Sequence, residues 1–163
     1  MTRNHICTHR APVAIEAGHK SSGTKIAMTA PVAIEGQGTA VHDDTAKKMQ
    51  FWLPDEYDDL SKIPKPTSPY VKVLEVPPAF GAVHRYNGSF NDERSREKVI
   101  ELLHQLKEDG LKLDEDEAMR CYQSWGYNPP FTVPYLRRNE VWIPLTEKQV
   151  KEMTQVLSES NVK

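Results

Sequence analysis

One capped amphipathic helix in the second half of the chain limits the fold more than any other feature. Asn91 is expected to be its N-cap, and Gly110 is expected to follow its last turn. Between them, apolar residues recur at helical spacing, at Val99, Leu102, Leu103 and Leu106. Predicted strands precede the helix (residues 70–76 and 79–87) and follow it (residues 119–125 and 140–145). This order predicts an α+β fold in which an antiparallel sheet carries a helix on one face.

The rest of the 163-residue chain fits the same single domain, residues 1–163. Strands are predicted over residues 25–35 and 49–53, and loops over residues 36–48 and 55–68. The acidic residues 114–117 are expected to form a turn. Thr146 and Gln149 have the spacing of a capping box, which predicts a terminal helix over residues 146–158.

A six-residue segment occurs twice near the N-terminus. Residues 11–16 and residues 30–35 are both A-P-V-A-I-E. A single duplication does not indicate a solenoid. The upstream copy is instead expected to pair as an extra strand, either with its own sheet or with the sheet of a partner copy.

Composition excludes several classes of protein. The formal net charge is −2 and no dense basic stripe is present, so a nucleic-acid partner is not expected. No apolar run is long enough to span a membrane, and the N-terminus leads into no signal-peptide h-region. Cys7 and Cys121 are interpreted as free thiols of a reducing compartment. The protein is therefore predicted to be intracellular, most simply cytoplasmic, with an organelle left open.

Catalytic motifs are not found in the sequence. It contains no phosphate-binding glycine loop, no G-x-S-x-G elbow and no H-E-x-x-H zinc helix. The acidic residues 114–117 lack the other ligands of an EF-hand, so a solvated turn is favoured over a calcium site. The chain is therefore predicted to bind a ligand rather than to be an enzyme.

Two groups of residues offer candidate ligands. His5, Cys7 and His9 would share one face of an extended segment and could meet a soft metal or a heme iron, although a disordered arm is the favoured interpretation. His84 lies within a predicted strand whose face could line an apolar cleft. A structural histidine is the favoured alternative there.

Paired arginines mark the C-terminal third. Arg137 and Arg138 could hold a carboxylate of an acidic ligand. The favoured alternative is an internal salt bridge to Glu140 or Glu75 that fixes the last strand.

Five ordered blocks of sequence resemble the SOUL heme-binding family over residues 24–145. The blocks are K-I-A-M-T-A-P-V (25–32), F-W-L-P (51–54), Y-N-G-S-F (86–90), G-Y-N-P-P (126–130) and R-R-N-E-V-W (137–142). The resemblance implies a distorted antiparallel β-barrel of two similar halves flanked by helices. It also implies a non-covalently bound tetrapyrrole, with heme first, held reversibly for buffering, transport or signalling. Under it, Met28 and His84 are candidates for the cleft, and Arg137 and Arg138 for the propionates.

The N-terminal region departs from this family. Members usually carry two strands and a helix ahead of the block at residues 25–32, whereas this chain has only a short arm, residues 1–23, that is expected to match neither. The first half is therefore predicted to be truncated, and its apolar face to be covered by the arm or by a second copy in a homodimer. An interaction or scaffold protein that has lost the pigment is the alternative function. A small hydrolase is a third, and it lacks a nucleophile–base pair.

Overall fold

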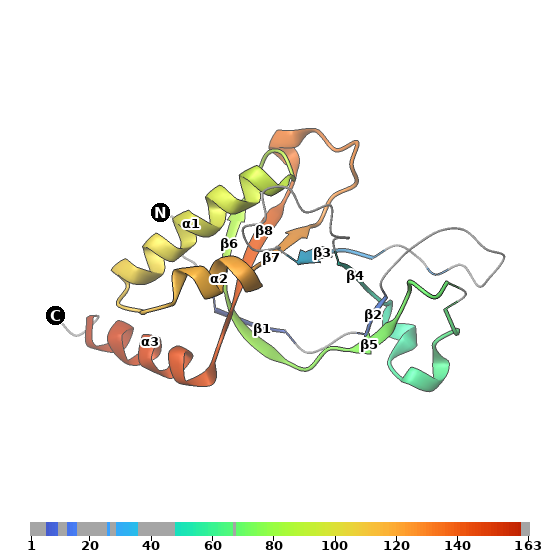
Figure 1. The fold of residues 1–163 in the computed structure, drawn as a ribbon, viewed down its shortest axis with the longest axis horizontal. Coiled ribbons are helices and arrows are strands. Elements are labelled where there is room, and N and C mark those ends of the chain that lie inside the picture. The colour runs from blue at the N-terminus through green and yellow to red at the C-terminus, as the bar shows by residue number, and fades with distance from the viewer. Residues whose placement is uncertain are drawn as a thin grey trace.

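The computed structural model describes residues 6–9, 13–15, 26, 29–35, 48–66 and 68–160. These residues form eight strands and three α-helices (Figure 1). Their bounds are β1 Ile6–His9, β2 Val13–Ile15, β3 Val32–Glu35, β4 Met49–Trp52, β5 Val73–Glu75, β6 Ala79–Tyr86, α1 Asp92–Glu108, α2 Glu115–Cys121, β7 Gln123–Gly126, β8 Asn139–Leu145 and α3 Glu147–Ser160. The class is α+β, as predicted.

All strands belong to one antiparallel sheet in the order β1-β6-β8-β7-β3-β4-β2-β5. Within the described residues β1 and β5 do not pair with each other, so the sheet is open and the predicted barrel is wrong. The edge strand β5 has only three residues and is followed at once by Val76, Pro77 and Pro78. Because proline cannot donate to a ladder, this sequence ends the strand before it could extend along a closing neighbour.

The strand order has an internal symmetry. Read outward from the β3–β7 pair, β3, β4, β2 and β5 on one side correspond to β7, β8, β6 and β1 on the other. In the second half, residues 87–122 separate β6 from β7 and include α1 and α2. In the first half, only residues 16–31 separate β2 from β3. This symmetry agrees with two similar halves, the first of them shortened.

Both copies of the duplicated segment lie beside β4. Val32 of β3 pairs with Phe51 of β4, and Ile15 of β2 pairs with the same Phe51 from the other side. The upstream copy therefore pairs with its own sheet. Residues 1–23 therefore contribute two strands, β1 and β2, to the sheet.

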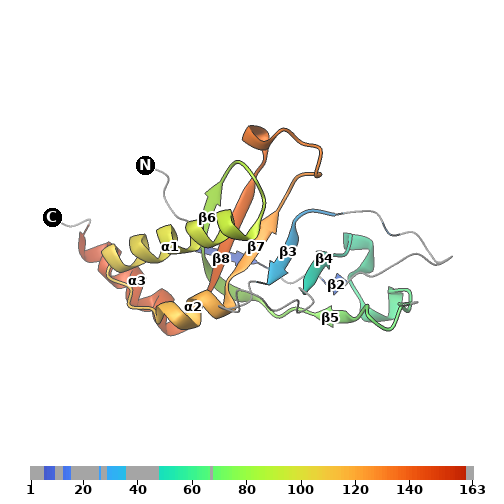
Figure 2. The same cartoon turned by 45° about the horizontal axis from the view of Figure 1, so that its top comes forward.

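Helix α1 packs on one face of β6 and β8 to form the main core. Its apolar stripe (Val99, Leu102, Leu103 and Leu106) meets Ala82 and Tyr86 of β6 and Val141, Ile143 and Leu145 of β8. The predicted caps are present: Asn91 Oδ1 accepts the backbone N–H of Arg94, and Gly110 has a φ of 87°. The Tyr86 hydroxyl and Ser95 Oγ form a buried hydrogen bond of 3.0 Å that ties strand to helix. All three α-helices gather over one end of the sheet, while β3, β4, β2 and β5 extend beyond them (Figures 1 and 2).

Helix α2 occupies the position where an acidic turn and the start of a strand were predicted. The Asp114 side chain accepts the backbone N–H of Glu117 at 2.8 Å, and three acidic residues then fill the first turn. Negative charge at a helix N-terminus is favourable, so the acidic run starts a helix. The strand begins only at Gln123. By contrast, the predicted capping box of α3 is confirmed. Gln149 Oε1 accepts the backbone N–H of Thr146 at 2.8 Å, and Thr146 Oγ1 accepts the backbone N–H of Gln149 at 3.3 Å.

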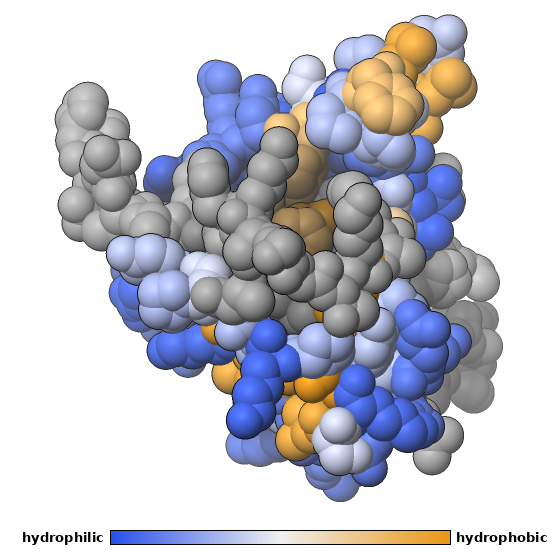
Figure 3. Space-filling view, turned by 90° about the vertical axis from the view of Figure 1, so that its right-hand side faces the viewer, coloured by the Kyte–Doolittle hydropathy of each residue, from blue (hydrophilic) through white to orange (hydrophobic). Residues whose placement is uncertain are grey.

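The loop between β7 and β8 carries a cluster of exposed apolar side chains. Phe131 is 88% exposed, Tyr135 70%, Leu136 63% and Val133 46%. In Figure 3 apolar surface gathers at the top of the molecule, where this loop projects above the sheet in Figure 1.

Candidate functional site

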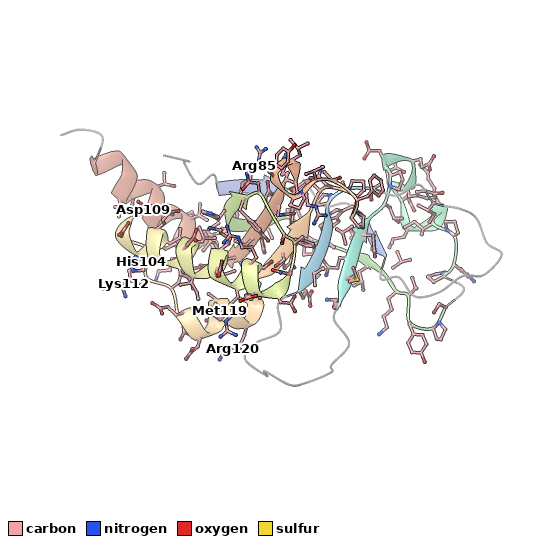
Figure 4. All side chains as sticks on the ribbon, turned by 90° about the horizontal axis from the view of Figure 1, so that it is seen from above. Arg85, His104, Asp109, Lys112, Met119 and Arg120 are labelled. Carbon is pink, nitrogen blue, oxygen red and sulfur yellow. The ribbon has the colours of Figure 1, made fainter. Side chains whose placement is uncertain are left out.

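The two faces of the sheet have different surroundings. Ser124 pairs with Val141 on one side and with Ile34 on the other, so all three lie on the face that α1 covers. Seen from above, Arg85 lies on the side of the sheet away from α1 and α2, whereas His104, Lys112 and Arg120 lie on the outer surface of the helical side (Figure 4). The side facing the helices is the one that continues past α1 over β3 and β4.

Beyond α1 this face is apolar and no α-helix of the described chain covers it. It presents Val32 and Ile34 from β3 and, through the register, Phe51 and Met49 from β4. These side chains form the floor of an open cavity of about 420 Å³. Its lining residues are Thr29, Ala30, Val32, Ile34, Met49, Phe51, Phe90, Gly126, Tyr127, Asn128, Pro129 and Pro130. We call this space the apolar cavity.

Phe90 divides the apolar cavity from a second recess of about 250 Å³ at the N-terminus of α1. Phe90 and Ile34 line both spaces. A methyl group at Gly126 would lie only 3.1 Å from the ring of Phe90, so a glycine there lets the ring rest against β7. The position of Phe90 thus depends on the small residue beneath it.

The polar groups of the lining already have partners. The Thr29 hydroxyl donates to the carbonyl of Trp52. The Tyr127 hydroxyl donates to Glu140 at 2.7 Å, and Asn128 Oδ1 accepts the backbone N–H of Arg138 at 2.6 Å. Among the described lining residues there is no histidine, cysteine or charged side chain. The cavity therefore offers apolar contact, and an occupant must be largely apolar.

The two arginines contact residues that line the apolar cavity. Arg137 donates to the carbonyls of Thr132 at 2.7 Å and Pro130 at 2.5 Å. Arg138 forms the expected internal salt bridge to the buried Glu140, at 2.6 Å, and lies 4.2 Å from the centre of the Tyr127 ring. Both side chains therefore hold the loop that forms one wall of the cavity.

His84 lies under α1, apart from the apolar cavity. Its Nε2 is 3.6 Å from Glu101 of that helix, and the side chain is only 16% exposed. Burial lowers the pKa of His84, opposed by the neighbouring Glu101 carboxylate and by a hydrogen bond with Gln105. The arrangement is that of a structural histidine, the alternative that the sequence favoured.

The remaining predicted ligands lie mostly outside the described residues. His5 and Met28 are outside them, and Met28 immediately precedes the cavity residue Thr29. Cys7 and His9 belong to β1, whose backbone pairs with β6. Within the described part of the chain, no group of three metal-binding side chains comes together. The metal site at His5, Cys7 and His9 stays a prediction.

Sequence reasoning missed two of the three aromatic residues that line the cavity, Phe51 and Phe90, and the third, Tyr127, appeared only within a family block. A signal for Phe51 was present, because large apolar side chains recur at every second position, at Val32 and Ile34 and again at Met49 and Phe51. No local pattern identified Phe90, since it meets the sheet only through the turn after β6. Across the described residues, no helix is both long and apolar enough to cross a membrane.

Comparisons with known proteins agree with the sequence resemblance. No curated protein is significantly similar in sequence. Among solved structures, the EcmrR C-terminal domain is similar with a TM-score of 0.58 and 9% identity, covering 88% of this chain and 97% of that domain, which shows a shared fold. The model of the SOUL heme-binding protein family matches residues 15–144, beginning nine residues earlier than the sequence blocks indicated. The chain belongs to the SOUL heme-binding protein family.

Proposed function

We propose that the apolar cavity binds a tetrapyrrole, with heme as the first candidate, non-covalently and reversibly. Family membership suggests this ligand class. The observation that carries the proposal is the open cavity of about 420 Å³ on the half of the sheet that no α-helix of the described residues covers. This volume falls within the range of small-molecule sites, roughly 300–1,000 Å³. Because the cavity is open, a planar ligand can insert one edge and leave the other in solvent.

The lining residues suit the macrocycle rather than its metal. Phe51 and Phe90 supply aromatic surface, and Val32, Ile34 and Met49 supply aliphatic surface. The described lining contains no histidine or cysteine; Met49 and Tyr127 are its side chains of a type that can ligate heme iron, and no axial ligand is assigned. Weak, contact-based binding suits buffering or transport, and we propose no catalytic role.

Arg138 is the better of the two proposed partners for the ligand carboxylates. Although it pairs with Glu140, its side chain is 46% exposed, and its guanidinium lies over Tyr127, a cavity residue. Arg137 donates hydrogen bonds to two backbone carbonyls of the loop that forms the cavity wall. Met28 stays a candidate because it precedes Thr29, whereas His84 faces α1 and is not included.

A hemin titration of the purified chain, followed at the Soret band against a protein-free blank, tests the proposal. A saturable shift at a fixed stoichiometry is expected. Met49→Glu, at a cavity residue that is 38% exposed, should weaken binding roughly tenfold because it places a charge against the macrocycle. Leu60→Glu, at an exposed residue outside the cavity, is the matched control and should leave the affinity unchanged.

The role of Arg138 has its own test. Hemin and its dimethyl ester should differ in affinity for the wild-type chain, because only free propionates can pair with a guanidinium. The difference should shrink in Arg138→Gln. An equal difference in both proteins would remove Arg138 from the site.

A non-saturating rise in hemin absorbance would rule out the tetrapyrrole. The alternative is then an interaction or scaffold protein, in which an element of another chain, or of a second copy, covers the cavity. The apolar face of β3 and β4, which no described helix covers, supports this alternative. A mass by light scattering above that of one chain would favour the second copy.

A further inference from the structure

The apolar tip of the β7–β8 loop turns its side chains away from the core. Phe131, Val133, Tyr135 and Leu136 form this tip, and all four side chains are exposed. Soluble surfaces rarely gather large apolar side chains on one short segment without a partner. The loop projects from the body of the molecule, so the tip is convex (Figures 1 and 3).

Hydrogen bonds to the loop hold the tip in its exposed position. The Arg137 guanidinium is bound to the carbonyls of Pro130 and Thr132. The backbone N–H of Gly88, in the turn after β6, donates to the carbonyl of Pro134 at 2.9 Å. These bonds hold the tip in place, so it can meet a partner without losing much conformational freedom.

Part of the backbone of the tip needs no hydrogen bond from water. Pro129, Pro130 and Pro134 have no N–H group. The N–H groups of Thr132 and Leu136 donate within the loop, to the carbonyls of Pro129 and Val133. Lipid supplies no hydrogen bonds, so a segment that enters it must satisfy its own polar groups. This loop meets part of that requirement.

The charge distribution of the loop also favours contact with lipid. Residues 127–138 contain no aspartate or glutamate, and their charged residues are Arg137 and Arg138 at the base of the tip. Aromatic and aliphatic side chains with arginines behind them are typical of segments at a membrane–water interface. A second copy or another folded protein fits less well, because a stable interface takes about 20–30 residues a side. The tip offers four side chains on a narrow loop.

We propose that this tip is a peripheral anchor that docks the protein on a lipid bilayer surface. Asn128, Pro129 and Pro130 of the same loop form a wall of the apolar cavity. Docking therefore brings the cavity close to the bilayer, where apolar ligands partition. The inference goes beyond the proposed function and holds for any apolar ligand.

Cosedimentation of the full chain with phosphatidylcholine vesicles, with and without added phosphatidylserine, tests the anchor. The wild-type chain should bind both kinds of vesicle saturably. The double variant Phe131→Ser/Tyr135→Ser should lose roughly tenfold or more in partition coefficient, because two buried apolar side chains are removed. Its melting temperature should match the wild type, since both residues are exposed.

The matched control is Leu60→Ser/Tyr70→Ser, at residues 54% and 81% exposed on another part of the chain. It should bind vesicles like the wild type. The anchor is overturned if the wild-type chain binds neither vesicle, or if both double variants lose binding equally. It is also overturned if the chain does not bind vesicles and light scattering shows self-association that the tip variant loses. A second copy of the chain would then cover the tip. The hemin titration is done without lipid, so its result does not depend on whether the chain binds vesicles.

Discussion

Replacing Gly81 by alanine should disrupt the row of tryptophans on the sheet face opposite α1. Trp125 and Trp142 stack there with ring centres 6.1 Å apart, and Trp52 meets Trp125 edge-on at 5.9 Å. The Trp142 indole lies directly over Gly81. A methyl group at Gly81 would overlap that ring, with Cζ2 only 2.5 Å away. Because the neighbour is a stacked ring on a strand, the conflict cannot be relieved by a small movement.

The expected cost follows from two contributions. Inserting a methyl group into a packed site costs about 1–3 kcal/mol. Moving Trp142 also loses its stack on Trp125, which contributes about 0.5–1.5 kcal/mol beyond burial. The sum, about 2–4 kcal/mol, should lower the melting temperature by roughly 5–15 °C for a domain of this size. The fold should survive, since domains are stable by about 5–15 kcal/mol.

Thermal and urea unfolding followed by far-ultraviolet circular dichroism measure this cost. Gly88→Ala is the control, because its φ is 105° and nothing lies within 4 Å, so only backbone strain of about 1 kcal/mol is expected. In a Trp142→Val background, Gly81→Ala should become neutral or stabilising by about 0.5 kcal/mol, since the ring is gone and glycine weakens a strand. Equal losses in both backgrounds would refute the steric argument.

Three further predictions concern the helix–strand interface. Tyr86→Phe should cost about 1–2 kcal/mol by urea unfolding, because it leaves the Ser95 hydroxyl buried without its partner, and Ser95→Ala should add little to it. Asn91→Ala should cost about 1 kcal/mol in the same assay, because the N–H of Arg94 loses its cap. Burial lowers the pKa of His84 below its ordinary value of 6.5, so the unfolded chain binds more protons than the folded chain just below that pH. Stability should therefore fall as the pH drops through about 6.5, and His84→Gln should flatten this slope; an unchanged slope would contradict the assignment.

The second half of the fold could be predicted because its signals are local. The caps of α1 at Asn91 and Gly110 and the capping box at Thr146 are present where the sequence placed them. Each depends on a side chain or a φ angle within a few residues. Alternation of apolar residues also placed β6 and β8 to within one residue.

The wrong predictions lie where one sequence pattern is compatible with two local structures. Asp114 and the acids after it suit a solvated turn or the first turn of a helix, and the packing of Ala118 and Tyr122 into the core decides for the helix. Strand order and closure are long-range properties. The duplicated segment indicated an extra strand, but nothing local showed that it would lie between β4 and β5.

The candidate site was harder to predict because its residues meet only in three dimensions. The apolar cavity combines β3, β4, the turn after β6 and the loop after β7. The blocks that carry the family resemblance do contain Phe51, Phe90 and Pro130, yet each block is short and shows no chemistry by itself. The arginines stood out because they are charged. In the structure both arginines stabilise the loop after β7, a role that their charge alone does not reveal.

The symmetry of the sheet explains why the cavity is apolar. In the strand order, β4 and β3 of the first half correspond to β8 and β7 of the second, and the face that α1 buries in the second half continues as Val32, Ile34, Met49 and Phe51 in the first. Burial of such side chains is favourable by about 25 cal/mol per Å² whatever covers them. Whatever covers these side chains, the sheet favours an apolar occupant. The tetrapyrrole proposal adds a planar shape and carboxylates at the rim. The Met49→Glu variant tests the apolar wall, and the Arg138→Gln comparison tests the carboxylates.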